Sequence, residues 1–265
     1  DLSVDWQVTN LSSDEGWDEA MAGCDYVLHV ASPIAMQLPK DEDEMVKPAV
    51  EGTLRVLKAA SKAGVKRVVI TSSVAAIMYG TDKQGVFNEE DWTDPKSKTT
   101  NVYAKSKTLA EQAAWDFMEH DTSGMELSTV LPAMVFGPIL EEDFGVSVGA
   151  ILDMMNGKYP IVPNWDMGVV DVRDVASLEL LAMTKPEAAG KRFVCSAENM
   201  FMKDQNEYLS ELFPESASKI PKRVAPNWLI KFLALFLPAL KMIAEGLGKE
   251  LSLIHISEPT RPSLI

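Results

Sequence analysis

A tyrosine and a lysine lie four residues apart near the start of the segment NVYAKSKTLAEQAAWDF, residues 101–117. On a helix, this spacing places the side chains of Tyr103 and Lys107 on one face. A tyrosine hydroxyl, with its usual pKa of about 10, is a poor acid–base group at neutral pH, but a nearby ammonium group stabilises the phenolate and lowers that pKa. The pair therefore indicates general acid–base chemistry. The alternative is two amphipathic side chains that cover a core, because this spacing is common by chance.

Small and hydroxyl-bearing residues lie at the ends of three predicted strands, in HVASP (29–33), TSSVAA (71–76) and LPAMVFGP (131–138). In a parallel sheet flanked by helices, ligands bind beyond the carboxyl ends of the strands. These three segments are therefore expected to meet in one crevice. The hydroxyl of Ser73 would then polarise the same substrate oxygen as Tyr103.

The elements that must position these residues alternate along the chain. Short apolar runs predict strands, and the stretches between them carry helical patterns, with Gly64 expected to end the longest helix. The predicted strands are 4–11, 25–32, 66–73, 127–137 and 191–197, and the predicted helices are 12–23, 43–64 and 101–120. Strands separated by helices imply βαβ units, so we expect an α/β fold with a doubly wound parallel sheet covered on both faces.

One apolar segment, NWLIKFLALFLPALKMIAEGL at residues 227–247, needs its own interpretation. Lys231, Pro238 and Lys241 interrupt it, whereas a membrane span needs about 20 consecutive apolar residues. We therefore expect two short buried helices joined at Pro238.

The composition argues against several classes of function. The 265 residues carry a formal net charge of −14, so a nucleic-acid-binding surface is not expected. Cys24 and Cys195 are the only cysteines and form no CxxC pair, which favours a reducing compartment over a disulfide framework or a metal site. The opening residues, DLSVDWQVTN, have no signal-peptide pattern. We predict a cytoplasmic monomer or homodimer that binds neither nucleic acid nor membrane.

The two ends of the sequence predict that the chain is a fragment of a longer parent. The terminal LSLIHISEPTRPSLI, residues 251–265, has no helical or alternating period. Its first part, LSLIHISEPTR, resembles the translation of a transposon-end adapter used in DNA sequencing libraries. We expect residues 251–265 to be a non-native tail without a packed partner. The N-terminus lacks Met and begins at a predicted strand.

Several motifs together resemble the extended short-chain dehydrogenase/reductase family, within the NAD-dependent epimerase/dehydratase superfamily. They are CDYVLHVASP (24–33), PAVEGTLRVLKAASKAGVKRVVITSSVAA (48–76), EEDWTD (89–94), YAKSKTLAEQAAWDF (103–117), LPAMVFGP (131–138) and GVVDVRDVASLELLAM (168–183). They run in family order and resemble the branch of dihydroflavonol reductases, cinnamoyl-CoA reductases and bacterial aldehyde reductases. The resemblance implies a Rossmann-like sheet and reduction of a small aldehyde or ketone by NADPH or NADH, with NADP favoured.

The resemblance also implies a role for each matching residue. Tyr103 would protonate the carbonyl oxygen, Lys107 would lower the pKa of Tyr103 and hold the nicotinamide ribose, and Ser73 would hydrogen-bond the substrate oxygen. The residues expected along the cofactor are Asn10, Leu11, Ala31, Ser32, Ser72, Pro132, Ala133 and Val135, together with Tyr103 and Lys107. No metal is implied. His29 is expected to be a core histidine, and Asp171 a helix cap or a link between lobes.

The sequence departs from the family pattern at the cofactor pyrophosphate. The glycine-rich GxxGxxG turn, whose helix N-terminus would hold that group, does not occur in the 265 residues. The implied organisation is a partial dinucleotide-binding domain at 1–138 with returns at 168–198, a smaller substrate lobe at 139–167 and 199–250, and the tail. Two alternatives remain open: an NAD-dependent sugar-nucleotide epimerase or dehydratase of the same family, and a catalytically silent NAD(P)-binding module.

Overall fold

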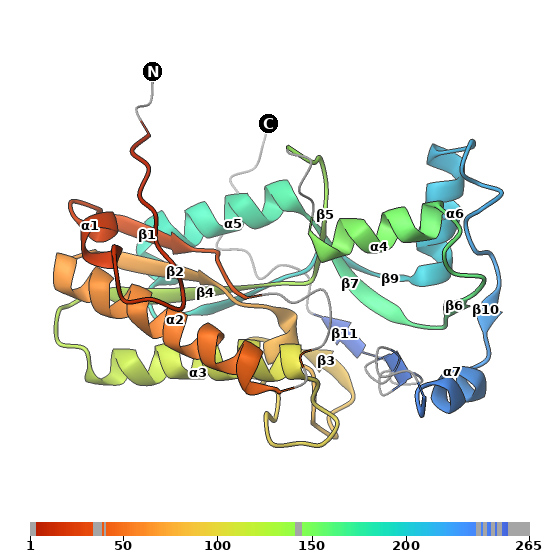
Figure 1. The fold of residues 1–265 in the computed structure, drawn as a ribbon, viewed down its shortest axis with the longest axis horizontal. Helices are drawn as coiled ribbons and strands as arrows, with labels where there is room; N and C mark the ends of the chain where they lie inside the picture. The colour runs from red at the N-terminus through yellow and green to blue at the C-terminus, as the bar shows by residue number, and fades with distance from the viewer. Residues whose placement is uncertain are drawn as a thin grey trace.

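The centre of the molecule is a sheet of four parallel strands in the order β1-β2-β4-β8 (Figure 1). The computed structural model describes residues 4–33, 39, 41–140, 145–236, 240, 243–244, 247 and 251–253. The central strands are β1 (Tyr26–His29), β2 (Arg67–Thr71), β4 (Glu126–Pro132) and β8 (Arg192–Cys195). This confirms the predicted α/β fold with a parallel sheet.

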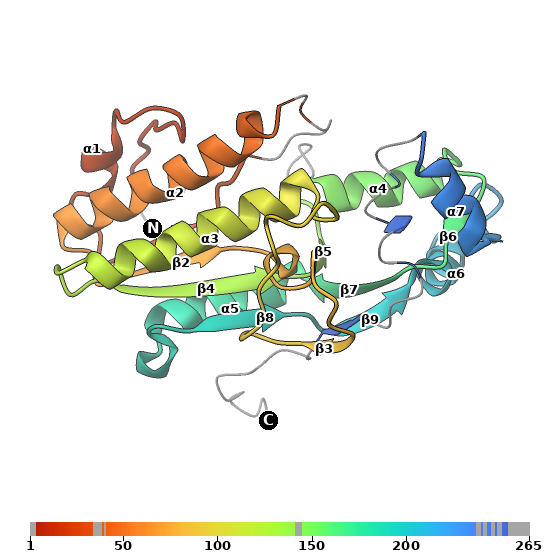
Figure 2. The ribbon, with the colours of Figure 1, turned by 90° about the horizontal axis from the view of Figure 1, so that it is seen from below.

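Helices cover both faces of this sheet. The long helices α2 (Asp43–Ala63) and α3 (Val102–His120) pack side by side on one face, and α5 (Val172–Thr184) lies on the other (Figure 2). The two faces of β2 are buried accordingly: Val68 packs with Leu57 of α2, whereas Val69 packs with Leu178 of α5. A strand buried on both sides needs apolar side chains without alternation, which is why the apolar runs predicted it correctly.

Local sequence sets the ends of the two long helices. Gly64 has φ 77° and closes α2, because glycine adopts this left-handed conformation without strain. At the start of α3, the Asn101 side chain accepts a hydrogen bond from Ala104 N at 2.9 Å. This cap fixes where α3 begins, and so which of its residues face the sheet.

A second group of elements lies beyond the carboxyl ends of the central strands (Figure 1). It contains a three-stranded sheet of β5 (Met134–Phe136), β7 (Asp166–Asp171) and β9 (Glu198–Phe201), in which β9 runs antiparallel to β7. Beside it lie α4 (Val146–Met155), β6 (Val162–Pro163), α6 (Met202–Leu212), β10 (Val224–Ala225) and α7 (Asn227–Leu233). The remaining elements are α1 (Trp17–Met21), η1 (Val74–Ala76), β3 (Gly85–Phe87), η2 (Pro186–Ala188) and β11 (Leu251–Leu253). The division into a dinucleotide-binding domain and a substrate lobe stays a prediction.

Four predicted elements differ from the structure. The strand predicted at 4–11 is wrong: residues 4–10 have no strand partner among the described residues, and a strand forms only beside a neighbour. The helix predicted at 12–23 is confined to α1. The strand predicted at 127–137 divides at Ala133, because β5 leaves the central sheet and pairs with β7. The strand predicted at 191–197 ends at Cys195 and is not the last, since β9 follows it.

Helix α7, at the start of the apolar segment 227–247, is less buried than expected. Ile230 of α7 is 4% exposed, but Trp228 and Phe232 of the same helix are 69% and 53% exposed. The expected junction at Pro238 lies outside the described residues. Within the part of the chain that the structure describes, no helix has the length and apolar character needed to cross a membrane.

The first three residues of the expected tail, 251–253, pack against the rest of the protein. Strand β11 pairs in parallel with β3, and Leu253 is 3% exposed in a cluster with Ile77 and Phe87. This differs from the expectation that residues from 251 onward have no packed partner. Burial of a leucine side chain against apolar neighbours is the physical reason for the pairing. Residues 254–265 lie outside the described residues.

Removing residues 251–265 is expected to lower the free energy of unfolding by about 2 kcal/mol, because burying one leucine side chain contributes about 1.5–3 kcal/mol. Chemical denaturation monitored by tryptophan fluorescence measures the change. A chain that ends at Leu253 keeps β11 and is the matched control. An unchanged denaturation midpoint in the shorter chain would contradict the packing of β11 and support the tail interpretation.

Candidate active site

The carboxyl ends of the central strands meet at one edge of the sheet, as expected. His29 at the end of β1 lies opposite Ile70 of β2, and Thr71 at the end of β2 lies opposite Val130 of β4. The segments that carry the predicted residues therefore begin side by side. The predicted residues at this edge are Ala31, Ser32, Ser72, Ser73, Pro132 and Ala133.

Ser73 is held in a tight turn directly after β2. It caps the short helix η1, where its Oγ accepts a hydrogen bond from Ala75 N at 3.1 Å, and it is 8% exposed. Its neighbour Ser72 donates from its backbone N to Val130 O at 2.7 Å. These bonds fix the turn against β4, so the Ser73 hydroxyl has a defined position at the strand ends.

Helix α3 brings Tyr103 to the same place. The Tyr103 hydroxyl lies near the Ser73 side chain. Burial raises the pKa of Tyr103 above its usual value, and the nearby Ser73 hydroxyl, which favours the phenolate, only partly offsets this. The direction is opposite to the expected lowering of the Tyr103 pKa by Lys107, because desolvation of the phenolate outweighs the other contributions.

Lys107 lies one turn further along α3 and is 7% exposed. Its Nζ donates a hydrogen bond to Thr71 O at 3.1 Å, which ties α3 to the end of β2. Burial lowers the pKa of Lys107 to about 8, and the carboxylate of Glu111 acts in the opposite direction. The ammonium group is therefore held inside the site and does not extend to solvent, as it would if Lys107 were an amphipathic side chain that covers a core.

Two residues without predicted catalytic roles behave as expected. His29 is 6% exposed, and its Nε2 lies 3.5 Å from Thr53 Oγ1. Burial, together with the charge of Lys107, lowers the pKa of His29 to about 4, so the ring is neutral at pH 7. Asp171 caps α5 by accepting a hydrogen bond from Arg173 N at 2.8 Å.

The remaining predicted cofactor residues lie in two other places. Val135 belongs to β5, which pairs with β7. The Leu11 carbonyl accepts a hydrogen bond from Nη1 of Arg55 on α2 at 2.8 Å. The amide oxygen of Asn10, a residue expected along the cofactor, accepts a hydrogen bond from Ser12 N at 2.9 Å within its own turn. Asn10 is thus hydrogen-bonded within its own turn, and Leu11 is hydrogen-bonded to α2.

One buried carboxylate at this site was not predicted. Glu111 follows Lys107 by four residues on α3 and is 1% exposed. Its carboxylate accepts hydrogen bonds from Ser72 Oγ, from Thr129 Oγ1 at 2.9 Å and from Arg192 Nε at 2.7 Å. The sequence held a signal for it, because a spacing of four places Glu111 on the same helix face as Lys107. A glutamate in a helix is ordinarily solvated, so that signal carried no weight alone.

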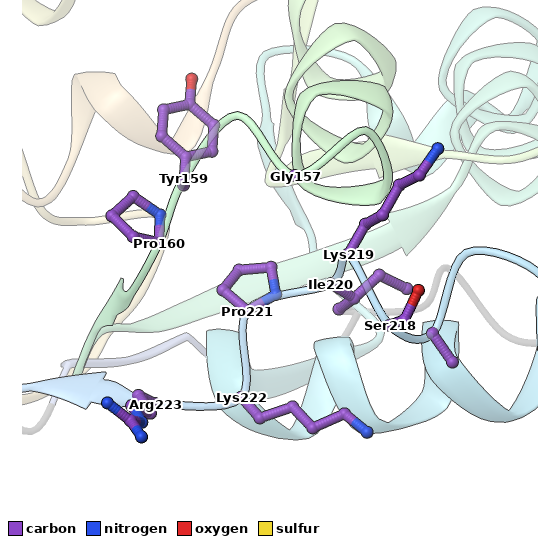
Figure 3. Close-up of a pocket in the computed structure, with 10 residues that line it drawn as sticks. Gly157, Tyr159, Pro160, Ser218, Lys219, Ile220, Pro221, Lys222 and Arg223 are labelled. Atoms are coloured by element: carbon purple, nitrogen blue, oxygen red, sulfur yellow. The ribbon is translucent and has the colours of Figure 1, made fainter.

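A hollow of about 440 Å³ lies away from these residues, beside β6 and β10 (Figure 3). Tyr159 and Pro160 line one side of it, and residues 217–223 line the other. Ser73, Tyr103 and Lys107 are not among its lining residues. The chemistry-bearing residues therefore define the candidate site, and the hollow is a separate feature of the surface.

The arrangement is suited to proton transfer to an oxygen atom. The hydroxyl groups of Ser73 and Tyr103 lie near each other at the strand ends, with the buried ammonium group of Lys107 nearby. In the described ranges of the chain, no three or more His, Cys, Asp or Glu side chains gather in a way that could hold a metal ion. A carbonyl oxygen that gains negative charge during a reaction would find a proton donor here.

Comparisons with known proteins agree with this geometry. A family model described as the 3-beta hydroxysteroid dehydrogenase/isomerase family matches residues 4–213. Cinnamoyl-CoA reductase 1 of Petunia hybrida is 37% identical over 258 residues, which cover 92% of this chain and 75% of that protein. An anthocyanidin reductase of Vitis vinifera is 33% identical over 222 residues, covering 78% of this chain and 65% of that protein. The crystal structure of yeast methylglyoxal/isovaleraldehyde reductase Gre2 complexed with NADPH has 33% identity and a TM-score of 0.72, covering 80% of this chain and 69% of that one.

Proposed function

Because the chain belongs to the 3-beta hydroxysteroid dehydrogenase/isomerase family, we propose that its site reduces the carbonyl group of an aldehyde or ketone with hydride from NADPH. The observation that carries the proposal is the placement of the Ser73 and Tyr103 hydroxyl groups beside the buried Lys107 at the strand ends. The relatives that the chain matches are reductases, and Gre2 was crystallised with NADPH.

The residues at the strand ends fit a nicotinamide cofactor. An ammonium group has three N–H donors, and within the described residues Lys107 Nζ gives one to Thr71 O. The other donors of Lys107 would hold the hydroxyls of the nicotinamide ribose. The backbone at Ala31 and Ser32 would lie along the cofactor, with Pro132, Ala133 and Val135 near the nicotinamide amide and Ser72 beside them. The cofactor supplies the hydride, while the protein supplies position and a proton.

Tyr103 would act as the proton donor in this reaction. Its raised pKa keeps the hydroxyl protonated at neutral pH, which is the form that a donor needs. Ser73 would hold the carbonyl oxygen by a second hydrogen bond while negative charge develops there. The positive charge of Lys107 would stabilise the phenolate that remains after proton transfer, so its influence on Tyr103 would be greatest late in the reaction.

We also propose that the pyrophosphate-binding part of the site comes from a segment outside these 265 residues. No GxxGxxG turn occurs in the chain, and a dinucleotide pyrophosphate is typically held by backbone N–H groups at a helix N-terminus. Residues 139–167 and 199–250 would form the substrate lobe beside the dinucleotide-binding domain. The protein would act in the cytoplasm as a monomer or homodimer on a small carbonyl compound.

The chain alone is expected to bind NADPH far more weakly than a parent that carries a glycine-rich turn. Ser73, Tyr103 and Lys107 hold only the nicotinamide end, so the charged pyrophosphate would lack its N–H donors. Isothermal titration of both proteins with NADPH measures the difference. Micromolar affinity in the chain alone would show that its own residues suffice for the pyrophosphate.

Isotope transfer tests the proposed reaction itself. NADPH that carries deuterium at the reacting carbon of the nicotinamide is expected to give a deuterated alcohol from a panel of simple aldehydes, detected by mass spectrometry. A sugar-nucleotide epimerase or dehydratase would instead retain its NAD and release no labelled alcohol. A silent NAD(P)-binding module would bind the cofactor without turnover, and either outcome would refute the reductase proposal.

A further inference from the structure

A buried carboxylate joins the helix that carries Tyr103 and Lys107 to three strands of the central sheet. Glu111 Oε2 accepts a hydrogen bond from Ser72 Oγ, at the end of β2. Its Oε1 accepts hydrogen bonds from Thr129 Oγ1 of β4 at 2.9 Å and from Arg192 Nε of β8 at 2.7 Å. The side chains of Glu111 and Arg192 are 0% and 9% exposed, so this ion pair is removed from water.

Arg192 extends the same connection to the loop after β3. Its Nη1 donates to Glu89 O at 2.6 Å and to Asp91 O at 2.8 Å. The guanidinium group also lies over the Trp92 ring, 3.7 Å from its centre. A cation in this position is attracted to the face of the aromatic ring. The guanidinium therefore has several fixed partners, and Glu111 is paired with a group that cannot easily move away.

Stability alone is a poor explanation for this ion pair. Taking two charges out of water costs free energy that their attraction often fails to recover, and apolar pairs of similar volume are frequently as stable. What a buried charge pair with several directional hydrogen bonds does provide is one fixed register between its elements. Here the elements are α3 and the turn that carries Ser72 and Ser73.

We propose that Glu111 is a positioning residue for carbonyl reduction: with Arg192, it holds α3 in register with the Ser72–Ser73 turn, so that Tyr103 and Lys107 meet the substrate oxygen and the cofactor. This inference rests on the proposed reductase function. Glu111 itself need not touch the substrate, since it acts through the residues one and two turns before it on α3 and through Ser72.

The charge of Glu111 adds a second effect on Lys107. Burial lowers the pKa of Lys107 to about 8, and Glu111 is the group that raises it. Removal of the carboxylate charge would therefore let Lys107 lose its proton at a lower pH. Residues four apart on a helix are neighbours on its surface, so the negative charge of Glu111 lies close enough to Lys107 to stabilise its ammonium form.

Other groups around Lys107 do not replace this contribution. His29 of β1 is neutral at pH 7, and Tyr103 of α3 stays protonated because burial raises its pKa. Glu179 of α5 is hydrogen-bonded to the hydroxyl of Thr71, the residue whose carbonyl receives Lys107 Nζ. Arg192 of β8 is paired with Glu111 and carries a positive charge, which disfavours the charged form of Lys107.

Glu111→Gln in the full-length reductase is the primary test, because the amide keeps the shape and removes the charge. We expect kcat to fall roughly 10- to 100-fold through misplacement of the reacting groups, with the KM for the carbonyl substrate little changed. The alkaline limb of the kcat/KM profile is expected to move to lower pH, because the charge that raises the pKa of Lys107 is gone. The exposed Glu119→Gln on the same helix is the matched control and should change neither quantity.

A double variant separates positioning from folding. Glu111→Gln with Arg192→Met leaves no unpaired buried charge, so its melting temperature should recover relative to Glu111→Gln alone. The lowered kcat and the shifted pH limb should persist, because the carboxylate that orders Ser72 and favours charged Lys107 is still missing. A double variant with the wild-type kcat and pH profile would overturn the inference and leave Glu111 with a purely structural role.

Two further measurements keep this inference distinct from the proposed function. Tyr103→Phe is assayed in parallel: if it keeps full turnover, the reductase mechanism fails, whereas its loss of turnover beside an unaffected Glu111→Gln refutes only the role of Glu111. Nuclear magnetic resonance titration of lysine side-chain carbons, with Lys107 assigned through Lys107→Met, needs no activity. The Lys107 pKa should fall in Glu111→Gln, and an unchanged pKa would overturn the electrostatic part of the inference.

Discussion

Replacing Tyr103 by Phe, in a parent chain that carries a glycine-rich turn, is expected to lower the turnover number by roughly 10²–10⁴-fold, the usual contribution of general acid catalysis. Phe keeps the aromatic ring at the start of α3 and removes only the hydroxyl, which lies near Ser73. Since burial raises the pKa of Tyr103, this hydroxyl is a protonated donor at neutral pH, and its loss leaves the developing oxyanion without a proton source. NADPH affinity should change little.

Steady-state kinetics with a fixed aldehyde and varied NADPH measures this effect. Tyr208→Phe removes the same atom from a residue of α6 that is 59% exposed, and it should leave turnover unchanged. Turnover of Tyr103→Phe within a few-fold of wild type would rule out the catalytic interpretation of α3.

Lys107→Met is expected to weaken NADPH binding by roughly 10- to 100-fold, which corresponds to the loss of a hydrogen bond from a charged group. Met fills similar space in the buried position but carries no donor and no charge. Turnover should also fall, because the phenolate of Tyr103 would form without a neighbouring cation. Lys105→Met, two residues earlier, is the matched control, since Lys105 forms an ion pair with Glu42 instead of reaching the strand ends.

The pH dependence provides a separate test of Lys107. Its pKa of about 8 means that the ammonium group loses its proton as the pH rises through that value. The kcat/KM of the wild-type enzyme should therefore decline above about pH 8, whereas Lys107→Met should lack this limb and remain low throughout. A wild-type profile that stays flat through that region would show that the charge of Lys107 is not needed.

The sequence predicted those parts of the fold that short segments decide for themselves. Helices α2 and α3 were placed within one residue, because their caps are local and their apolar positions repeat with the helical period. The run before Ser73 indicated a strand buried on both faces, and β2 is such a strand. The order of strands and helices then predicted the parallel sheet, and hence the common edge where Ser73, Tyr103 and Lys107 meet.

Some predictions were wrong where the structure of a segment depends on an element that is distant in the sequence. Residues 4–10 have the composition of a strand but no partner among the described residues, and the predicted strand at 127–137 changes sheets at Ala133 because β7 lies beside its second half. The exposure of Trp228 and Phe232 on α7 is a similar case, since an apolar segment is buried only where another element covers it.

The sequence by itself thus determined the family and the order of elements, and it placed Tyr103 and Lys107 on one helix face, because a spacing of four along one helix is a local property. Only the tertiary structure decided the electrostatic environment of Tyr103 and Lys107. Glu111 meets its partners Thr129, Ser72 and Arg192 across 18, 39 and 81 residues of chain, and the raised pKa of Tyr103 comes from burial by the assembled molecule. Desolvation and charge pairing depend on which distant segments exclude water from a site, and that information exists only once the chain is folded.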